Sequence, residues 1–221
     1  MPTTSIDFET LRKGMVERQI AGRGVRDPRV LEAMRTVPRE AFVPEALAEF
    51  AYDDTPLPIA EEQTISQPYI VALMAEALEL RPGDKVLEIG AGSGYAAAVL
   101  SRIAREVYAI ERHESLARAA QARLGRLGYS NVHVFHGDGT LGWPAQASYD
   151  GIVVAAGGPE VPPALLDQLA AGGRLVIPIG PDPRTQDLVR VRHRKDGSDV
   201  REDLGPVRFV PLIGAQGWAE T

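Results

Sequence analysis

The sequence predicts an α/β fold with a doubly wound, mostly parallel sheet. Short apolar segments lie at residues 86–89, 107–110, 132–135, 151–155 and 174–179. Stretches with helical spacing lie between them, near 94–104, 114–127 and 162–171. Strands that are apolar on both faces and alternate with helices form parallel sheets covered on both sides. A chain of 221 residues, 44% of them hydrophobic, can also bury a core of its own as one domain.

A helical extension is predicted ahead of the sheet, over residues 5–50. Its apolar side chains recur at helical spacing, at Phe8, Leu11, Met15, Val16 and Ile20. Asp27 followed by Pro28 is typical of a second helix start. Residues 51–66 then contain prolines and acidic residues with little periodicity, which predicts a long loop. Loops of that length in compact domains are often functional.

A hairpin is predicted after the sheet. Alternating stretches flank the turn Asp196-Gly197-Ser198, and the second ends in VRFVPL. This pattern indicates two antiparallel strands at the edge of the sheet. Arg190, Arg192 and Arg194 alternate along one of them and are expected to form a solvated edge.

Composition excludes several classes of protein. The net charge of −6 and the pI of 5.3 argue against a nucleic-acid partner, since such binding relies on clustered cations. No apolar run is long enough to span a membrane, and residues 1–14 lack the apolar core of a secretion signal, so we expect a cytoplasmic protein. With no Cys and four His at unsuitable spacings, no metal site is predicted.

A nucleotide site is predicted where the first strand ends. Gly90, Gly92 and Gly94 follow that strand directly and precede a helix. In open α/β sheets, ligands bind outside the carboxyl ends of the strands, where glycines allow close approach of the backbone. Glu111 ends the next strand, 21 residues after Gly90, where a carboxylate would accept hydrogen bonds from ribose hydroxyls. A tight structural turn and a solvated carboxylate are the alternatives.

The pattern favours S-adenosylmethionine over a dinucleotide. Tyr95 stands where the dinucleotide fingerprint requires its third glycine. Glu88, a costly acid within a buried strand, would favour a sulfonium or ammonium group. Asp138, after the third strand, could accept a hydrogen bond from the adenine amino group, although alone it is better explained as a turn former before Gly139.

At this point the residues carry a resemblance that covers nearly the whole chain from Leu11. The segments are AFVP, AYDDTPLPI, QTISQPYIVALM, VLEIGAGSGY, VYAIER, NVHVFHGDGTLGW, YDGIVVAA, GGRLVIPIG and VRFVPL. They resemble the protein-L-isoaspartate O-methyltransferases, with QTIS as the specific part. The resemblance implies a sheet of the class I methyltransferase type. It also implies a repair enzyme that uses S-adenosylmethionine to methylate the free α-carboxylate of L-isoaspartyl residues in damaged peptides and proteins.

The same resemblance implies that Ser66, the serine of QTIS, is the active-site residue. The local signal Ser66-Gln67-Pro68 also indicates a helix N-cap, and we expect both roles to be compatible. The cofactor-binding residues expected with it are Thr64, Glu88, Gly90, Gly92, Gly94, Glu111, Asp138 and Gly139. The chain departs from the family at Ala60-Glu61-Glu62, where relatives are glycine-rich, and the two carboxylates are expected to repel an anionic substrate modestly.

The expected organisation is a single domain, residues 1–221, acting as a monomer. It divides into the helical extension and substrate loop (1–66), the cofactor-binding core (67–180) and the C-terminal hairpin (181–221). Three other functions stay open. These are methylation of a small molecule or RNA, a nicotinamide-dependent oxidoreductase, and a cofactor-binding protein without activity.

Overall fold

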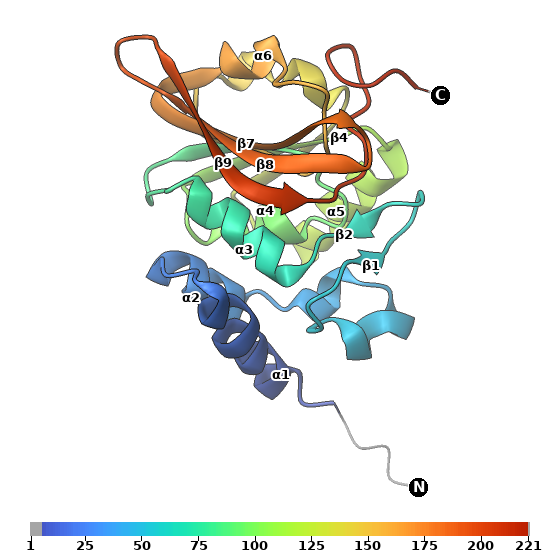
Figure 1. The fold of residues 1–221 in the computed structure, drawn as a ribbon. Helices are drawn as coiled ribbons and strands as arrows, with labels where there is room; N and C mark the ends of the chain where they lie inside the picture. Colours follow the sequence, from blue (N-terminus) through green and yellow to red (C-terminus); the bar gives the residue numbers. More distant parts are fainter. Residues whose placement is uncertain (1–5, 221) are drawn as a thin grey trace, which may run out of the picture.

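A seven-stranded sheet forms the centre of the computed structural model, which describes residues 6–220 (Figure 1). Residues 1–5 of the expected extension and Thr221 lie outside the described residues. The strand order is β5-β4-β3-β6-β7-β8-β9. The strands are β3 (Lys85–Ile89), β4 (Glu106–Glu111), β5 (Val132–His136), β6 (Tyr149–Val154), β7 (Leu169–Asp182), β8 (Thr185–His193) and β9 (Asp199–Val207). Strands β5 to β7 run parallel and β7 to β9 antiparallel, so the predicted fold class is confirmed.

Helices cover both faces of the sheet, which explains why its central strands are apolar throughout. Val86 of β3 joins the core on the side of α3 (Pro68–Ala77) and α4 (Tyr95–Ser101), while Leu87 joins the core on the other side. Helix α5 (Glu114–Arg126) lies with α3 and α4, and α6 (Pro163–Leu166) covers the opposite face (Figure 1). Two short helical turns, η5 (Gly139–Leu141) and η6 (Pro144–Gln146), follow β5.

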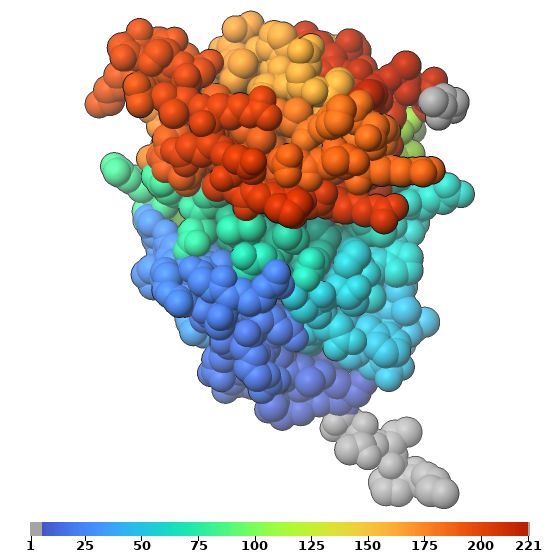
Figure 2. All heavy atoms as spheres, viewed as in Figure 1, coloured from blue at the N-terminus to red at the C-terminus, as the bar shows by residue number. Residues whose placement is uncertain are grey.

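The predicted helical extension forms a further layer beneath α3 and α4 (Figures 1 and 2). It comprises α1 (Phe8–Gly14), η1 (Met15–Ile20), η2 (Ala21–Arg23), α2 (Pro28–Thr36), η3 (Arg39–Phe42) and η4 (Glu45–Phe50). The predicted helix start is confirmed, because the Asp27 carboxylate accepts from the Arg29 amide at 2.8 Å and Pro28 is the first helical residue. Met34 and Phe42 are fully buried and attach this layer to the core.

The segment expected to be a long loop contains a small hairpin. Strands β1 (Leu57–Pro58) and β2 (Thr64–Ile65) pair antiparallel, with Leu57 opposite Ile65. Both of these apolar side chains are buried, whereas the tip between the strands is mostly exposed. A two-residue ladder is too short to leave a periodic signal in the sequence.

The C-terminal part differs from the prediction in two places. The helix expected at 162–171 is only α6, because β7 already begins at Leu169. The stretch expected to end in VRFVPL leaves the sheet at Val207, where β9 ends. Residues 208–220, here called the C-terminal tail, return to the carboxyl end of β6. The Leu212 amide donates to the Gly157 carbonyl at 2.8 Å, and the Trp218 indole donates to the same carbonyl at 2.9 Å.

The expectation of a solvated arginine edge was wrong for Arg190 and Arg192. Strand β9, not β8, is the outer strand. Both arginine side chains are mostly buried, and Arg190 also donates to the Ala77 carbonyl at the end of α3 at 3.2 Å. They pair with Glu79 and Glu202, and Arg174 joins Glu79 at 2.9 Å. The hydrogen bond from Arg192 and the nearby cations lower the pKa of Glu79 to about 2.

Candidate active site

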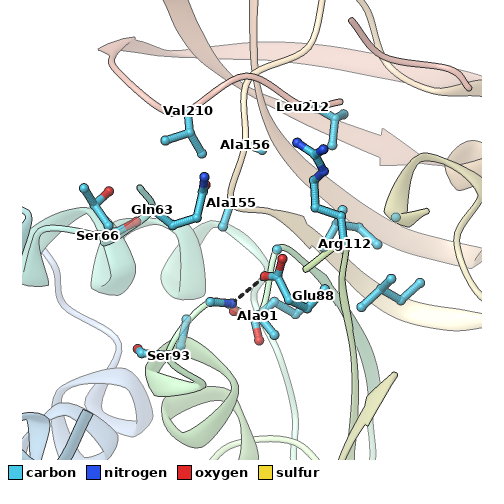
Figure 3. A pocket seen from close by; sticks show the side chains of 18 of the residues that line it. Gln63, Ser66, Glu88, Ala91, Ser93, Arg112, Ala155, Ala156, Val210 and Leu212 are labelled. Carbon is cyan, nitrogen blue, oxygen red and sulfur yellow. Dashed lines mark hydrogen bonds between the residues drawn. The ribbon is translucent and has the colours of Figure 1, made fainter. Parts of the chain in front are cut away.

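A cavity opens at the carboxyl ends of β3, β4 and β6, where the sequence predicts the nucleotide site (Figure 3). Its empty volume, including space that is open to solvent, is about 790 Å³. Gln63 and Ser66 lie on one side and Glu88 and Arg112 on the other, as Figure 3 shows. The lining includes seven predicted site residues, namely Thr64, Ser66, Glu88, Gly90, Gly92, Glu111 and Gly139.

The glycine turn forms the floor of this cavity. Gly90, Gly92 and Gly94 have φ angles of +88°, +51° and +86°, a region that strongly favours glycine. Gly94 does not line the cavity itself; it starts α4 and packs against Leu124 of α5. The three positions together turn the chain from β3 into α4 and bring backbone amides to the cavity.

Glu111 fixes the turn from the neighbouring strand. Its side chain is buried, and its two oxygens accept from the amides of Gly92 at 2.8 Å and His113 at 2.9 Å. Each oxygen keeps a further lone pair, so the carboxylate can still accept from a ligand hydroxyl. Glu111 lines the cavity, and its contact to ribose stays a prediction.

Glu88 is the most unusual group in the cavity. It is 1% exposed, and among the described residues its Oε2 has no hydrogen-bond partner. Burial raises the pKa of Glu88 well above its usual range, and the negative charge of Glu111 adds to the effect. A buried carboxylate without a partner is costly, and a bound cation would relieve that cost.

Asp138 is used within the protein. One carboxylate oxygen accepts from the amide and hydroxyl of Thr140 at 2.8 and 2.7 Å, and the other accepts from the Ala215 amide at 2.8 Å. Burial alone would raise its pKa, but these hydrogen bonds lower it. Asp138 is therefore the turn former that the alternative foresaw, and it also holds the C-terminal tail. The cavity is lined instead by Gly139, where a Cβ would lie 2.4 Å from Ile89.

Ser66 lies at the end of β2, directly before α3. The expectation that it caps this helix was wrong, because Gln67 is the N-cap and makes no side-chain capping bond. In the first turn of the helix the Tyr69 amide donates instead to the Asp54 carboxylate at 3.3 Å, and Ser66 lines the cavity.

A second hollow adjoins the cavity at Ser66. This groove has an empty volume of about 1620 Å³ and lies between the segment 56–70 and the start of the C-terminal tail. Thr64, Ser66, Ala155, Val210 and Pro211 line both hollows, so they form the junction between them. The charged side chains that line the groove belong to Arg23 and Arg208.

The two glutamates at the hairpin tip do not line either hollow. Glu61 instead accepts a hydrogen bond from the Ser115 hydroxyl at the start of α5, and Glu62 is exposed. The expected repulsion of an anionic substrate by these groups therefore lacks its structural basis. Both residues have φ near +56°, which a glycine would adopt more easily.

Sequence reasoning missed the part of the lining that the C-terminal tail supplies. Val210, Pro211, Leu212 and Ile213 close the cavity from above in Figure 3, where Val210 and Leu212 are labelled. Gln63 and Arg112 were also missed, although each adjoins a predicted site residue. Within residues 6–220, no group of three His, Cys, Asp or Glu side chains is placed to hold a metal ion. No helix in that range is long and apolar enough to cross a membrane.

Comparisons with known proteins agree on one family. The sequence model described as protein-L-isoaspartate(D-aspartate) O-methyltransferase matches residues 10–217. A protein-L-isoaspartate O-methyltransferase of Rhodopseudomonas palustris is 63% identical over 93% of this chain and 94% of its own length. A second relative, protein-L-isoaspartate O-methyltransferase 2 of Pelobacter propionicus, is 62% identical over 95% of this chain and 93% of its own.

Solved structures give the same result. One named protein-L-isoaspartate O-methyltransferase has a TM-score of 0.82 and 34% identity, over 93% of this chain and 67% of that one. Another, from Plasmodium falciparum and assigned to the same activity, was solved in complex with S-adenosyl-L-homocysteine. It has a TM-score of 0.77 and 26% identity, and covers 95% of this chain and 99% of its own.

Proposed function

Because the chain belongs to the protein-L-isoaspartate(D-aspartate) O-methyltransferase family, we propose that it methylates the free α-carboxylate of L-isoaspartyl residues in damaged peptides and proteins, using S-adenosylmethionine. Besides family membership, one structural observation supports the proposal. Ser66 lies at the junction between the cavity above the glycine turn and the groove beside it. A cofactor in the first and a peptide in the second would meet at its side chain.

The residues of the cavity fit S-adenosylmethionine, which supplies an electrophilic methyl group when bound. Glu88, buried without a partner, would face its positive charge. Glu111 and the amides of the glycine turn would hold the ribose and the methionine part. Thr64 and Gly139 line the same cavity and complete the proposed set, with Gly94 and Asp138 supporting it through the turn and the C-terminal tail.

The transfer needs alignment more than acid–base catalysis. An isoaspartyl α-carboxyl has a pKa of about 3.5 and is almost fully ionised at neutral pH, so no residue has to remove a proton. The Ser66 hydroxyl can donate a hydrogen bond to one carboxylate oxygen and direct the other toward the methyl group. Correct placement of two reactants is worth about 7–11 kcal/mol of the barrier. Val210 and Leu212 would exclude water from the reacting atoms.

The groove suits an anionic peptide substrate. Arg208 supplies positive charge along it, and Arg23 of the same lining pairs with Asp54 at 2.6 Å, while the protein as a whole carries a net charge of −6. Because this basic lining is limited to two residues, an isolated carboxylate on a peptide fits it better than a nucleic acid. The proposal includes a monomer that acts in the cytoplasm and has no nucleic-acid partner.

The decisive experiment compares two peptides that differ only in one linkage, L-isoaspartyl against L-aspartyl. We expect methylation of the first only, because in the normal linkage the carboxylate lies about one bond length further from the backbone. A displacement of about 1 Å can cost about a hundredfold in rate. Mass gain of the peptide with time gives the rate. Equal methylation of both peptides, or a preference for RNA or a small acid, would reject the proposal.

The same assay tests Ser66. We expect Ser66→Ala to lower kcat more than it weakens binding of S-adenosylhomocysteine, because the lost hydrogen bond orients the reacting carboxylate. Ser198→Ala is the matched control, since it removes the hydroxyl that donates to Asp196 in a distant turn. An unchanged kcat for Ser66→Ala would leave this residue with no role beyond lining the junction.

A further inference from the structure

Arg39 is a fully buried cation that lines neither the cavity nor the groove. It belongs to η3 in the N-terminal layer. Its Nε donates to the Ala51 carbonyl at 2.7 Å, and its Nη2 donates to the Ser66 carbonyl at 2.8 Å. Its guanidinium carbon lies 4.7 Å from the centre of the Tyr95 ring. Among the described residues, the third nitrogen, Nη1, has no hydrogen-bond partner.

Burying the charged guanidinium in this environment costs free energy. No carboxylate forms an ion pair with Arg39 within residues 6–220, so two carbonyls and one ring replace its hydration shell. Burial accordingly lowers the pKa of Arg39. An unpaired buried cation is destabilising, and apolar residues of similar volume commonly fill such places at no loss of stability. Packing alone therefore does not account for an arginine here.

The contacts of Arg39 join three parts of the site. Ala51 and Ser66 are the two ends of the segment that carries the β1–β2 hairpin, and Tyr95 is the first residue of α4 after the glycine turn. Tyr95 also lines the cavity. The guanidinium thus connects both ends of the hairpin segment to Tyr95, the residue that follows the glycine turn.

We propose that Arg39 is a positioning residue, which fixes the backbone of Ser66 and thereby places its hydroxyl relative to the cofactor. This inference rests on the proposed function of Ser66. The planar guanidinium presents donors at fixed angles, so one side chain serves both carbonyls while its face lies near the ring. A lysine has a single ammonium on a flexible stem and does not hold the two carbonyls in this geometry.

The first test compares Arg39→Met with the matched variant Arg12→Met. Arg12 lies in the same N-terminal layer and is also mostly buried, but it binds Tyr52 and Glu40 rather than Ser66. We expect Arg39→Met to lower kcat on the isoaspartyl peptide by about 10- to 100-fold, the cost of a displacement on the order of 1 Å. The Kd for S-adenosylhomocysteine should stay within about twofold. Arg12→Met should lower the melting temperature without this loss of kcat.

The second test is a double-mutant cycle with Ser66→Ala. If Arg39 acts through Ser66, Arg39→Met should reduce kcat by less than about twofold once the hydroxyl is absent. Multiplicative effects, or an unchanged kcat in Arg39→Met, would overturn the inference. Arg39→Lys and Arg39→Gln, which keep a polar donor, enter the same cycle if the methionine variant does not fold.

The two proposals fail in different ways. A wild-type protein that is inactive on the isoaspartyl peptide would reject the proposed function. A wild-type protein that is active, with independent effects of Arg39 and Ser66, would reject only the role of Arg39.

Discussion

Single residues decide the electrostatics of the cavity. Glu88 and Glu111 lie at or next to the ends of neighbouring parallel strands and are both buried. Of the two, only Glu111 has amide donors for each of its oxygens. The free-energy cost of burying a charged carboxylate is therefore higher at Glu88 than at Glu111. Glu111 stabilises the glycine turn in the free protein, whereas Glu88 is better satisfied when a cation is bound.

The first prediction concerns stability and pH. Glu88 has a folded pKa above its unfolded value, so between those two pH values the unfolded chain releases a proton that the folded chain retains. The contribution of this group to stability therefore falls as pH rises through that window. Glu88→Gln should melt at a higher temperature than the wild type at neutral pH, and the difference should shrink toward pH 4. Melting curves measured across that range will test it.

The same substitution that stabilises the free protein should weaken its affinity for the cofactor. Glu88→Gln should weaken S-adenosylmethionine about tenfold, since a contact to a charged group contributes at least about 1.5 kcal/mol. Glu106→Gln is the control, because Glu106 pairs with His133 at the opposite end of the same sheet. If both variants bound S-adenosylmethionine with the same affinity, Glu88 would have no contact with the cofactor.

The sequence was most informative where chemistry is local. The glycine turn and Glu111 could be predicted because a strand, its turn and the next strand end follow one another at short spacing. Ser66 could be placed only through the resemblance, since its residue type equally indicates a helix cap. Arg39 left no such signal, because its partners, Ala51 and Ser66, are 12 and 27 residues away.

Among the elements, the C-terminal tail is the one that the sequence did not reveal. The apolar stretch VRFVPL has the alternation of a strand, but Pro211 within it cannot donate to a sheet ladder. The tail instead bonds to Gly157 and Asp138, which are far away in sequence. Parallel strands, in contrast, were predictable because burial on both faces leaves a continuous apolar run.

The element-scale prediction is that Asp138→Ala loosens the tail. The variant loses the bond from Ala215 and the turn at Thr140, which should destabilise the protein by about 1–2 kcal/mol. Binding of S-adenosylhomocysteine should weaken as Val210 and Leu212 lose their position, and hydrogen exchange over 208–218 should accelerate.

Asp196→Ala supplies the comparison, since it breaks a similar turn at Ser198 in the exposed hairpin. It should leave both affinity and tail exchange unchanged. Weaker binding in Asp138→Ala without faster exchange would mean instead that Asp138 touches the adenine directly, as the sequence first indicated.

At the scale of the whole molecule, the cavity joins segments from most of the chain. Its lining runs from Gln63 to Ile213 and draws on the hairpin segment, three parallel strand ends and the tail. A ligand in this position contacts all of them and so stabilises the folded state as a unit. Glu79, just after α3, pairs with Arg174 of β7 and with Arg190 and Arg192 of β8, and so ties the end of this helix to both strands.

The corresponding prediction is a thermal shift. S-adenosylhomocysteine at 100 times its Kd should add about 2.7 kcal/mol of stability. For a domain of this length that corresponds to about 5–11 °C in melting temperature. NAD at the same concentration should give no shift, because Tyr95 occupies the place of the third dinucleotide glycine. A shift with NAD alone would reverse the cofactor assignment.

The strand order also governs how the chain reaches this structure. Strand β3 is made first among the parallel strands but ends in the centre, between β4 and β6. The partner β4 lies close in sequence, whereas β6 follows only after β5 and its connections.

Parallel pairs with long crossovers form slowly, because loop entropy is lost before their hydrogen bonds are gained. A chain in which only β5, β4 and β3 had paired would expose the free edge of an apolar strand. Such an edge is a template for aggregation. The cofactor would not protect such a chain, since residues 210–213, which close its cavity, would still be unplaced.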